Sequence, residues 1–169
     1  PDLATAPLRG NIDTRLRKLR EDNEYAGILL ARAGVRRLGL PETDGHVLPL
    51  EDWLPAPAQG ALGVAVREQD TETAQLVAAV EDPETRVCVT AERAVLAHLG
   101  GGCRVPIGAW ATLRAGMLRL AAFVADVDGK HFLTNTVEAT AEQPEAAGAD
   151  LAQQLLNAGG GKLLAEFRE

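Results

Sequence analysis

Three short apolar runs in the second half of the chain are separated only by tight turns. The runs are Ile107–Leu113, Met117–Asp126 and His131–Ala139, and the turns contain Ala115-Gly116 and Asp128-Gly129. Parallel strands need a crossover of a dozen or more residues, whereas connections this short join antiparallel strands. The pattern therefore predicts a three-stranded antiparallel meander.

Helical patterns precede and follow this predicted sheet along the sequence. One covers about Glu84 to Leu99, and a second covers Glu142 to Ala158, where Gly159-Gly160-Gly161 breaks it before a last short helix at Lys162–Phe167. A sheet with one apolar face needs a covering layer, and helices are the elements available here. We therefore expect residues 84–169 to form a small α+β domain.

The first 80 residues follow a different order. Leu3–Leu8 and Tyr25–Ala31 are expected strands on either side of a helix that Asn11 or Asp13 can cap, and Gly60–Arg67 is an expected strand before a helix at Asp70–Val80. Alternation of strand and helix is typical of α/β domains with parallel sheets. The predicted fold class is α/β followed by α+β.

Composition excludes several classes of function. The net charge of −7 argues against a general nucleic-acid binder, because neutralising phosphates requires a surplus of Lys and Arg. The apolar runs are shorter than the roughly 20 residues needed to cross a bilayer. The chain contains no serine, which excludes a serine hydrolase, and its two cysteines do not form a disulfide framework. We expect a protein of the cytoplasm that does not bind a membrane.

The loop Gly100-Gly101-Gly102-Cys103-Arg104 is the most unusual local sequence. One glycine is enough to end a helix, and two more remove side chains beside the sulfur. Arg104 favours the thiolate. Cys103 is therefore either an accessible reactive thiol or a small buried apolar residue. Cys88 falls on the apolar face of the preceding helix and is expected in the core, and the spacing of the Cys and His residues matches no metal site.

The segment from Arg9 to Arg15 lies where an expected strand gives way to a helix. Free N–H groups at the start of a helix attract anions, and the planar guanidinium group suits carboxylates. A carboxylate-rich ligand would fit this junction. The alternative is an ordinary solvated helix face with salt bridges.

Three segments resemble those of one family. Residues 92–108 (ERAVLAHLGGGCRVPIG) resemble the segment around the cofactor cysteine of porphobilinogen deaminases. Residues 9–19 (RGNIDTRLRKL) and residues 54–61 (LPAPAQGA) are similar to two further motifs of that family, in the same order. The similarity covers essentially the whole chain and corresponds to the later half of the family's length.

The resemblance implies an enzyme that joins four porphobilinogen molecules head to tail, releases ammonia each time and frees the linear tetrapyrrole hydroxymethylbilane. It also implies a dipyrromethane cofactor, attached by a thioether to Cys103. By the same resemblance, the cofactor-binding residues are Cys103, Arg9, Gly10, Arg15, Gln59 and Gly60, and the substrate-binding residues are Arg9, Arg15 and Arg37. The family uses no metal, and its catalytic aspartate lies in the N-terminal half, so no residue of this chain is assigned as catalytic.

The family's three-domain fold implies a layout for this chain. Residues 1–58 would belong to a periplasmic-binding-protein-like α/β domain two, residues 59–80 would complete domain one, and residues 84–169 would form the C-terminal α+β domain. The chain alone is then expected to be inactive without the N-terminal half, and the full enzyme is expected to be a monomer. Two alternatives stay open: a non-catalytic α/β module that binds a small polycarboxylate, and a regulatory or scaffold domain.

Overall fold

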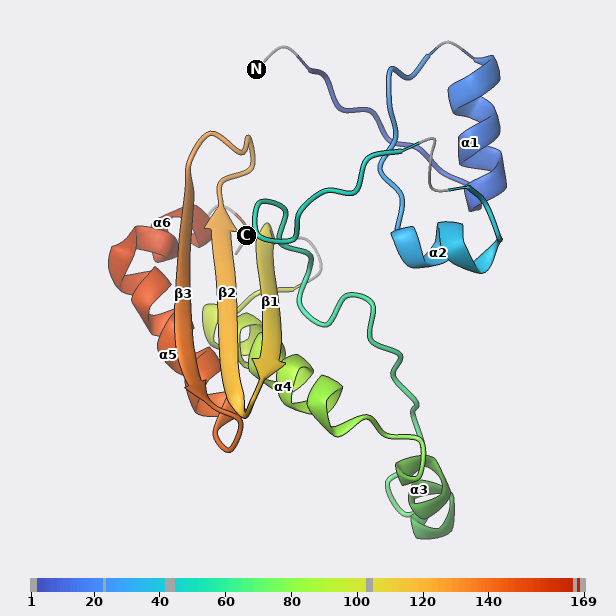
Figure 1. The fold of residues 1–169 in the computed structure, drawn as a ribbon. Coiled ribbons are helices and arrows are strands. Elements are labelled where there is room, and N and C mark those ends of the chain that lie inside the picture. Colours follow the sequence, from blue (N-terminus) through green and yellow to red (C-terminus); the bar gives the residue numbers. More distant parts are fainter. Residues whose placement is uncertain (1–2, 23, 42–44, 103–104, 166, 168–169) are drawn as a thin grey trace. The chain divides into compact units, whose positions relative to one another are not determined.

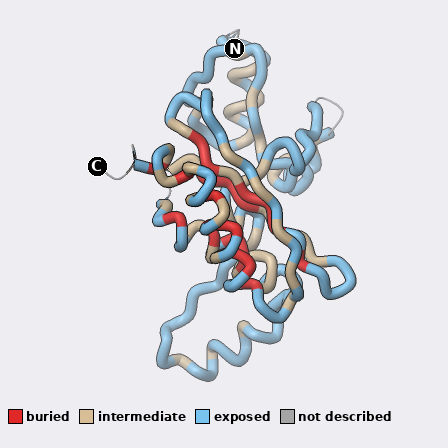
Figure 2. Tube along the Cα trace, turned by 90° about the vertical axis from the view of Figure 1, so that its left-hand side faces the viewer, coloured by how far each residue is buried: buried red, intermediate tan, exposed pale blue. Residues whose placement is uncertain are grey.

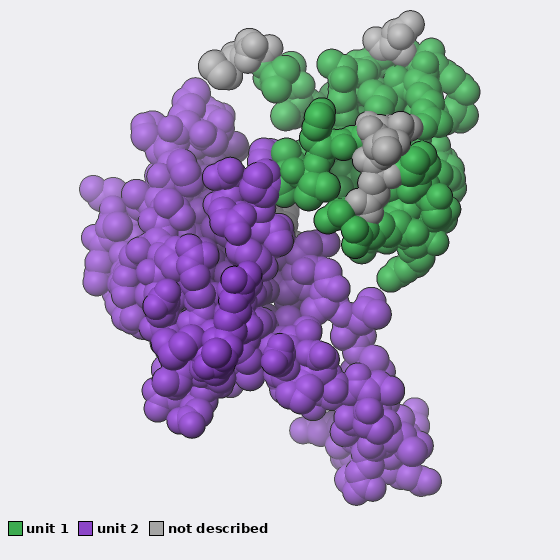
Figure 3. Space-filling view, viewed as in Figure 1, with its two compact units in different colours: residues 1–48 green, residues 49–169 purple. Residues whose placement is uncertain are grey.

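A computed structural model describes residues 3–22, 24–41, 45–102, 105–165 and 167. The chain divides into two compact units, residues 1–48 and residues 49–169 (Figure 3). The first unit is built around two short helices and the second around a sheet (Figure 1).

The first unit contains α1 (Ile12–Glu21) and α2 (Arg32–Arg37). Asn11 caps α1, because its side-chain oxygen accepts the backbone N–H of Thr14 at 2.9 Å. The predicted helix is therefore confirmed, with its expected cap.

Two strands predicted in this unit are not observed. Leu3–Leu8 and Tyr25–Ala31 belong to no sheet among the described residues. A strand forms only when its backbone N–H and C=O groups meet a neighbouring strand, and the described part of the unit supplies none. The α/β arrangement of this part consequently remains a prediction.

The second unit contains β1 (Ile107–Arg114), β2 (Met117–Ala125) and β3 (Phe132–Thr140), in the order β1-β2-β3 with antiparallel pairing. Ala115 (φ 49°) and Gly116 (φ 77°) form the two-residue connection between β1 and β2. Positive φ at both positions matches the right-handed twist of the paired strands. The predicted meander is confirmed.

Helices cover one face of the sheet. These are α4 (Pro83–Leu99), α5 (Pro144–Leu155) and α6 (Gly161–Ala165), and the segment Leu156–Gly160, which is kinked at Gly159 (φ 107°), joins the last two (Figure 1). The most buried residues lie between the helices and the sheet (Figure 2). Fully buried side chains of this core include Val95, Leu118, Leu120, Val124, Leu151 and Leu155. The predicted small α+β arrangement is confirmed.

The segment before α4 carries one more helix, α3 (Thr71–Ala78), whose N–H at Thr73 donates to the capping side chain of Asp70 at 3.1 Å. The strand predicted at Gly60–Arg67 is not paired with any described strand. Its apolar side chains are exposed, with Leu62 at 87% and Val64 at 63%. Within the described ranges, every helix is too short or too polar to span a membrane.

Candidate cofactor- and substrate-binding site

The turn before α1 brings two of the predicted site residues into contact. Arg15 Nε donates a hydrogen bond to the carbonyl oxygen of Gly10 at 2.8 Å. Gly10 has φ 125°, and a Cβ there would lie 2.8 Å from Thr14 Cγ2. Only glycine suits this backbone conformation and this close approach. The Arg15 side chain is thus anchored to the turn that Arg9 and Gly10 form.

Arg37 belongs to the same unit and is the last residue of α2. Gly34, on the same helix, packs on Ile12 at the start of α1, since a Cβ at position 34 would lie 2.5 Å from Ile12 Cδ1. Arg9 and Arg37 are both exposed, and no described residue forms an ion pair with either. Two exposed cations in one small unit are available for an anionic ligand.

Gln59 and Gly60 lie in a turn of the second unit that is tied to the sheet and to α4. Ala109 of β1 donates its N–H to the Pro55 carbonyl at 2.9 Å. Ala58 (φ 63°) donates its N–H to Glu92 Oε2 at 2.6 Å, and Gln59 donates its N–H to Ala56. Gln59 and Gly60 themselves are exposed at the turn.

Glu92 is a residue of this site region that the sequence pattern did not indicate. Its side chain is 6% exposed, and its second oxygen, Oε1, accepts the N–H of Ala111 at 2.8 Å. Burial raises the pKa of Glu92, and the two backbone N–H groups oppose that rise. The available signal was an acidic residue next to Ala91 on the face of α4 that also carries Val95 and Leu99.

The glycines before Cys103 have different roles. Gly100 ends α4 in the left-handed region (φ 68°). A Cβ on Gly101 would lie 2.5 Å from Ile107 Cδ1 and 2.8 Å from Leu96 Cδ1, whereas a Cβ on Gly102 would meet nothing within 4 Å. A side chain at position 101 would therefore require the ends of Ile107 and Leu96 to shift, whereas a methyl group at position 102 would require no such shift.

Cys103 and Arg104 lie outside the described residues. Their described neighbours, Gly102 and Val105, are joined by a hydrogen bond from the Val105 N–H to the Gly102 carbonyl at 3.0 Å. The reactivity of Cys103 stays a prediction.

Cys88 is half-buried and packs against the core, as expected from its position on α4. Burial, and then the nearby Glu92, raises the pKa of its thiol. Cys88 is therefore a poor nucleophile. Across the described residues, no group of three or more His, Cys, Asp and Glu side chains could hold a metal ion.

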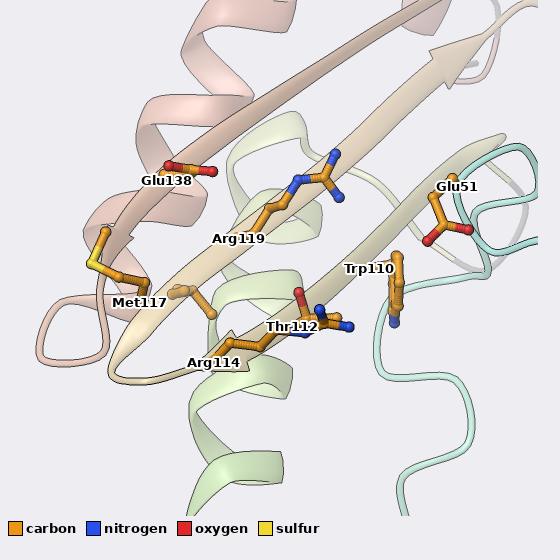
Figure 4. Close-up of a pocket in the computed structure, with 8 residues that line it drawn as sticks. Glu51, Trp110, Thr112, Arg114, Met117, Arg119 and Glu138 are labelled. Carbon is orange, nitrogen blue, oxygen red and sulfur yellow. The ribbon is translucent and has the colours of Figure 1, made fainter.

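A pocket lies on the sheet face opposite the helices (Figure 4). Thr112, Arg119 and Glu138 are cross-strand neighbours there, one on each of the three strands. The complete lining is Glu51, Trp110, Thr112, Arg114, Met117, Leu118, Arg119 and Glu138. None of the predicted site residues lines this pocket.

Comparison with known proteins relates both parts of the chain to one family. Residues 1–75 match the family model described as "Porphobilinogen deaminase, dipyromethane cofactor binding domain". Residues 86–157 match the model described as "Porphobilinogen deaminase, C-terminal domain". All predicted site residues except Cys103 fall in the first match, and Cys103 falls in the second.

Curated relatives extend the similarity over the whole chain. Porphobilinogen deaminase of Chlorobaculum tepidum is 44% identical over 100% of this chain and 55% of its own length. The proteins of the same name from Roseiflexus castenholzii and Thiobacillus denitrificans are 47% and 46% identical, over 98% and 94% of this chain and 54% and 52% of their own lengths. The chain spans about half the length of the curated relatives it matches. From these matches, which run through both units, the chain belongs to the porphobilinogen deaminase family.

Proposed function

We propose that this chain is the C-terminal part of a hydroxymethylbilane synthase, which joins four porphobilinogen molecules into linear hydroxymethylbilane with release of ammonia. The observation that carries the proposal is the turn at Arg9 and Gly10, within the region that matches the cofactor-binding model. There Arg15 Nε donates to the Gly10 carbonyl oxygen at 2.8 Å. Each porphobilinogen brings two carboxylates, so the growing chain accumulates negative charge. Exposed Arg9 and Arg37, together with Arg15, supply the opposite charge.

In this proposal the chain holds a dipyrromethane covalently. A Cβ on Gly102 would meet nothing within 4 Å, and Arg9, Gly10, Arg15, Gln59 and Gly60 are proposed to bind the group that Cys103 carries. When bound, this group supplies the primer to which substrate is added. A thiolate at Cys103 is the suitable nucleophile for forming a thioether, because sulfur is soft and is more easily deprotonated than a hydroxyl.

The segment 59–80 is proposed to complete a domain that the rest of the family's length provides. Leu62 and Val64 project apolar side chains into solvent, and on α3 Leu76 is 71% exposed. An extended segment and a helix that leave such side chains uncovered gain free energy when these side chains pack against other elements. Residues 1–58 would then belong to the α/β domain two, and residues 84–169 to the third domain.

No residue of this chain is proposed to be catalytic, because the family's catalytic aspartate belongs to the N-terminal half. The chain alone should therefore be inactive, and the complete enzyme should act as a monomer in the cytoplasm without nucleic acid or metal. The alternative of a non-catalytic polycarboxylate-binding module draws no support from relatives that carry the name of an enzyme.

Reconstitution tests the proposal. The 169-residue chain would be expressed alone and together with the N-terminal part of the Chlorobaculum tepidum relative, and porphobilinogen consumption measured. We expect turnover only from the pair, with a discrete added mass on this chain and a coloured product with Ehrlich's aldehyde. Cys103→Ser should abolish the added mass, and the control Cys88→Ala should retain it.

Two results would count against the proposal. Turnover by the chain alone would refute its dependence on the N-terminal half. A pair that assembles but neither consumes porphobilinogen nor gains mass at Cys103 would favour the binding module.

A further inference from the structure

We infer that Glu92 is a positioning residue whose buried carboxylate fixes the segment Leu54–Gly60 to β1 and α4, and so sets the place of Gln59 and Gly60. The contact itself does not depend on the proposed function. Its consequence for cofactor binding does, because Gln59 and Gly60 are cofactor-binding residues only under that function.

At the edge of the sheet, the Glu92 carboxylate accepts a backbone N–H that a neighbouring strand would otherwise accept. β1 is an edge strand, and the N–H of Ala109 on its outer side bonds to the Pro55 carbonyl at 2.9 Å. The next outward N–H, that of Ala111, bonds instead to Glu92 Oε1 at 2.8 Å. One side chain of α4 thus continues the ladder that the segment Leu54–Gly60 begins.

The other carboxylate oxygen, Oε2, binds the segment Leu54–Gly60 at Ala58, whose backbone conformation is energetically unfavourable for a residue with a Cβ. Ala58 has φ 63°, in the left-handed region that a residue with a Cβ seldom adopts. Its N–H donates to Glu92 Oε2 at 2.6 Å, and a hydrogen bond to a carboxylate is stronger than one to a neutral oxygen. The turn continues through Gln59 and Gly60 (φ 90°), and the N–H of Ala61 closes it on the Ala58 carbonyl.

The same helix, α4, is followed by the loop at residues 100–104, which contains Cys103. Glu92 lies seven residues before Leu99, and α4 ends at Gly100. An α-helix rises 1.5 Å per residue, so about 10 Å of rigid helix separates the carboxylate from the start of the loop. A fixed Glu92 therefore sets the position of the turn at Gln59 and Gly60 relative to Gly100, where α4 ends.

The burial of Glu92 is hard to explain by stability alone. Its side chain is 6% exposed, and no described cation pairs with it. A buried carboxylate without a cation is unfavourable relative to a packed apolar side chain. Here both of its oxygens are used, each on a different backbone segment.

Hydrogen exchange on the 169-residue chain tests the contact. In Glu92→Gln the side-chain amide keeps one acceptor and turns an N–H group toward the other backbone N–H, so we expect the Ala58 amide to exchange at least tenfold faster. The Leu120 amide in the core should keep its rate. Glu84→Gln, on the exposed side of the same helix, is the matched control and should leave both rates unchanged.

A second variant covers the case in which Glu92→Gln does not fold. Glu92→Asp keeps the charge but is one methylene shorter and cannot reach both N–H groups, so it should also speed exchange at Ala58. An Ala58 amide that exchanges at the wild-type rate in either folded variant would overturn the inference.

A second measurement separates positioning from a merely structural contact. In the reconstituted pair, Glu92→Gln should lower the fraction of chains with the added mass and raise KM for porphobilinogen several-fold, more than it lowers kcat. Faster exchange at Ala58 with unchanged mass and KM would overturn the positioning role. If the wild-type pair is itself inactive, the proposed function fails, while the exchange rates still decide the contact.

Discussion

Gly148 on α5 lies against the carbonyl oxygen of Ala91 on α4, so closely that a Cβ at position 148 would be 2.4 Å from that oxygen. The same Cβ would lie 2.5 Å from Ala94 Cβ. Both obstacles are backbone or the first side-chain atom, so neither can rotate away. The approach of the two covering helices is therefore set by the absence of a side chain at Gly148.

Gly148→Ala should destabilise the fold by about 1–2 kcal/mol, although alanine favours a helix by about 1 kcal/mol over glycine. The steric penalty exceeds the gain in helix propensity because the helices must separate. Urea unfolding followed by circular dichroism measures the difference. Gly63→Ala is the control, since a Cβ there meets nothing within 4 Å. Equal stability of both variants would show that the helices can shift freely.

The burial of Glu92 predicts a pH dependence of stability. Burial raises its folded-state pKa above the ordinary value of 4.5, so its contribution is fully present below that value and is lost as pH rises through the folded pKa. Asp70, Asp82 and Asp126 have lowered pKa values, so their contributions vary only below about 3.8. Glu92 should therefore act in a separate pH window, above 4.5.

The prediction is tested by the free energy of unfolding of wild type and Glu92→Gln at pH 4.5 and pH 7. The wild type should lose stability relative to the variant between these two values, because only the wild type must ionise a buried carboxyl group. The histidines titrate in both proteins and cancel in the difference. A wild-type advantage that grows with pH would mean that the backbone N–H groups outweigh burial.

Substitutions at Gly101 and Gly102 should have different effects, the first on stability and the second on cofactor attachment. Gly101→Ala should cost about 1 kcal/mol, because Ile107 and Leu96 must give way at the ends of their side chains. Gly102→Ala should leave stability within about 0.5 kcal/mol. Its methyl group would nevertheless stand beside Cys103, so the fraction of chains with an added mass should fall in the reconstituted pair. Full attachment in Gly102→Ala would show that Gly102 has no role at the thiol.

Local signals explain why α1 and much of the second unit were predictable. The connection at Ala115-Gly116 determines an antiparallel pairing by itself, and the caps Asn11 and Asp70 determine where helices begin. These choices involve residues only a few positions apart. The turn and the helix caps could therefore be predicted from the sequence, and the observed boundaries of the elements differ from the expected ones by only a few residues.

The features that escaped prediction depend on distant partners. The run Gly60–Arg67 has the composition of a strand, yet a strand exists only beside another, and no described strand lies beside it. Glu92 bonds to Ala58 and Ala111, which are 34 and 19 residues away. Its motif was recognised by resemblance, but nothing in the spacing indicates that the carboxylate joins two backbone segments.

Arg9 should contribute to binding without contributing to folding, because it is exposed and forms no ion pair with a described residue. In the reconstituted pair, Arg9→Leu should raise KM for porphobilinogen roughly tenfold or more, the effect of losing one charged hydrogen bond to a carboxylate. Its unfolding free energy should match the wild type. Arg17→Leu is the control: Arg17 pairs with Glu21 at 3.0 Å on the exposed face of α1, so its loss should cost about 0.3–0.5 kcal/mol of stability and leave KM unchanged. If Arg9→Leu and Arg17→Leu have the same KM, the carboxylates are bound by other cations and Arg9 does not belong to the site.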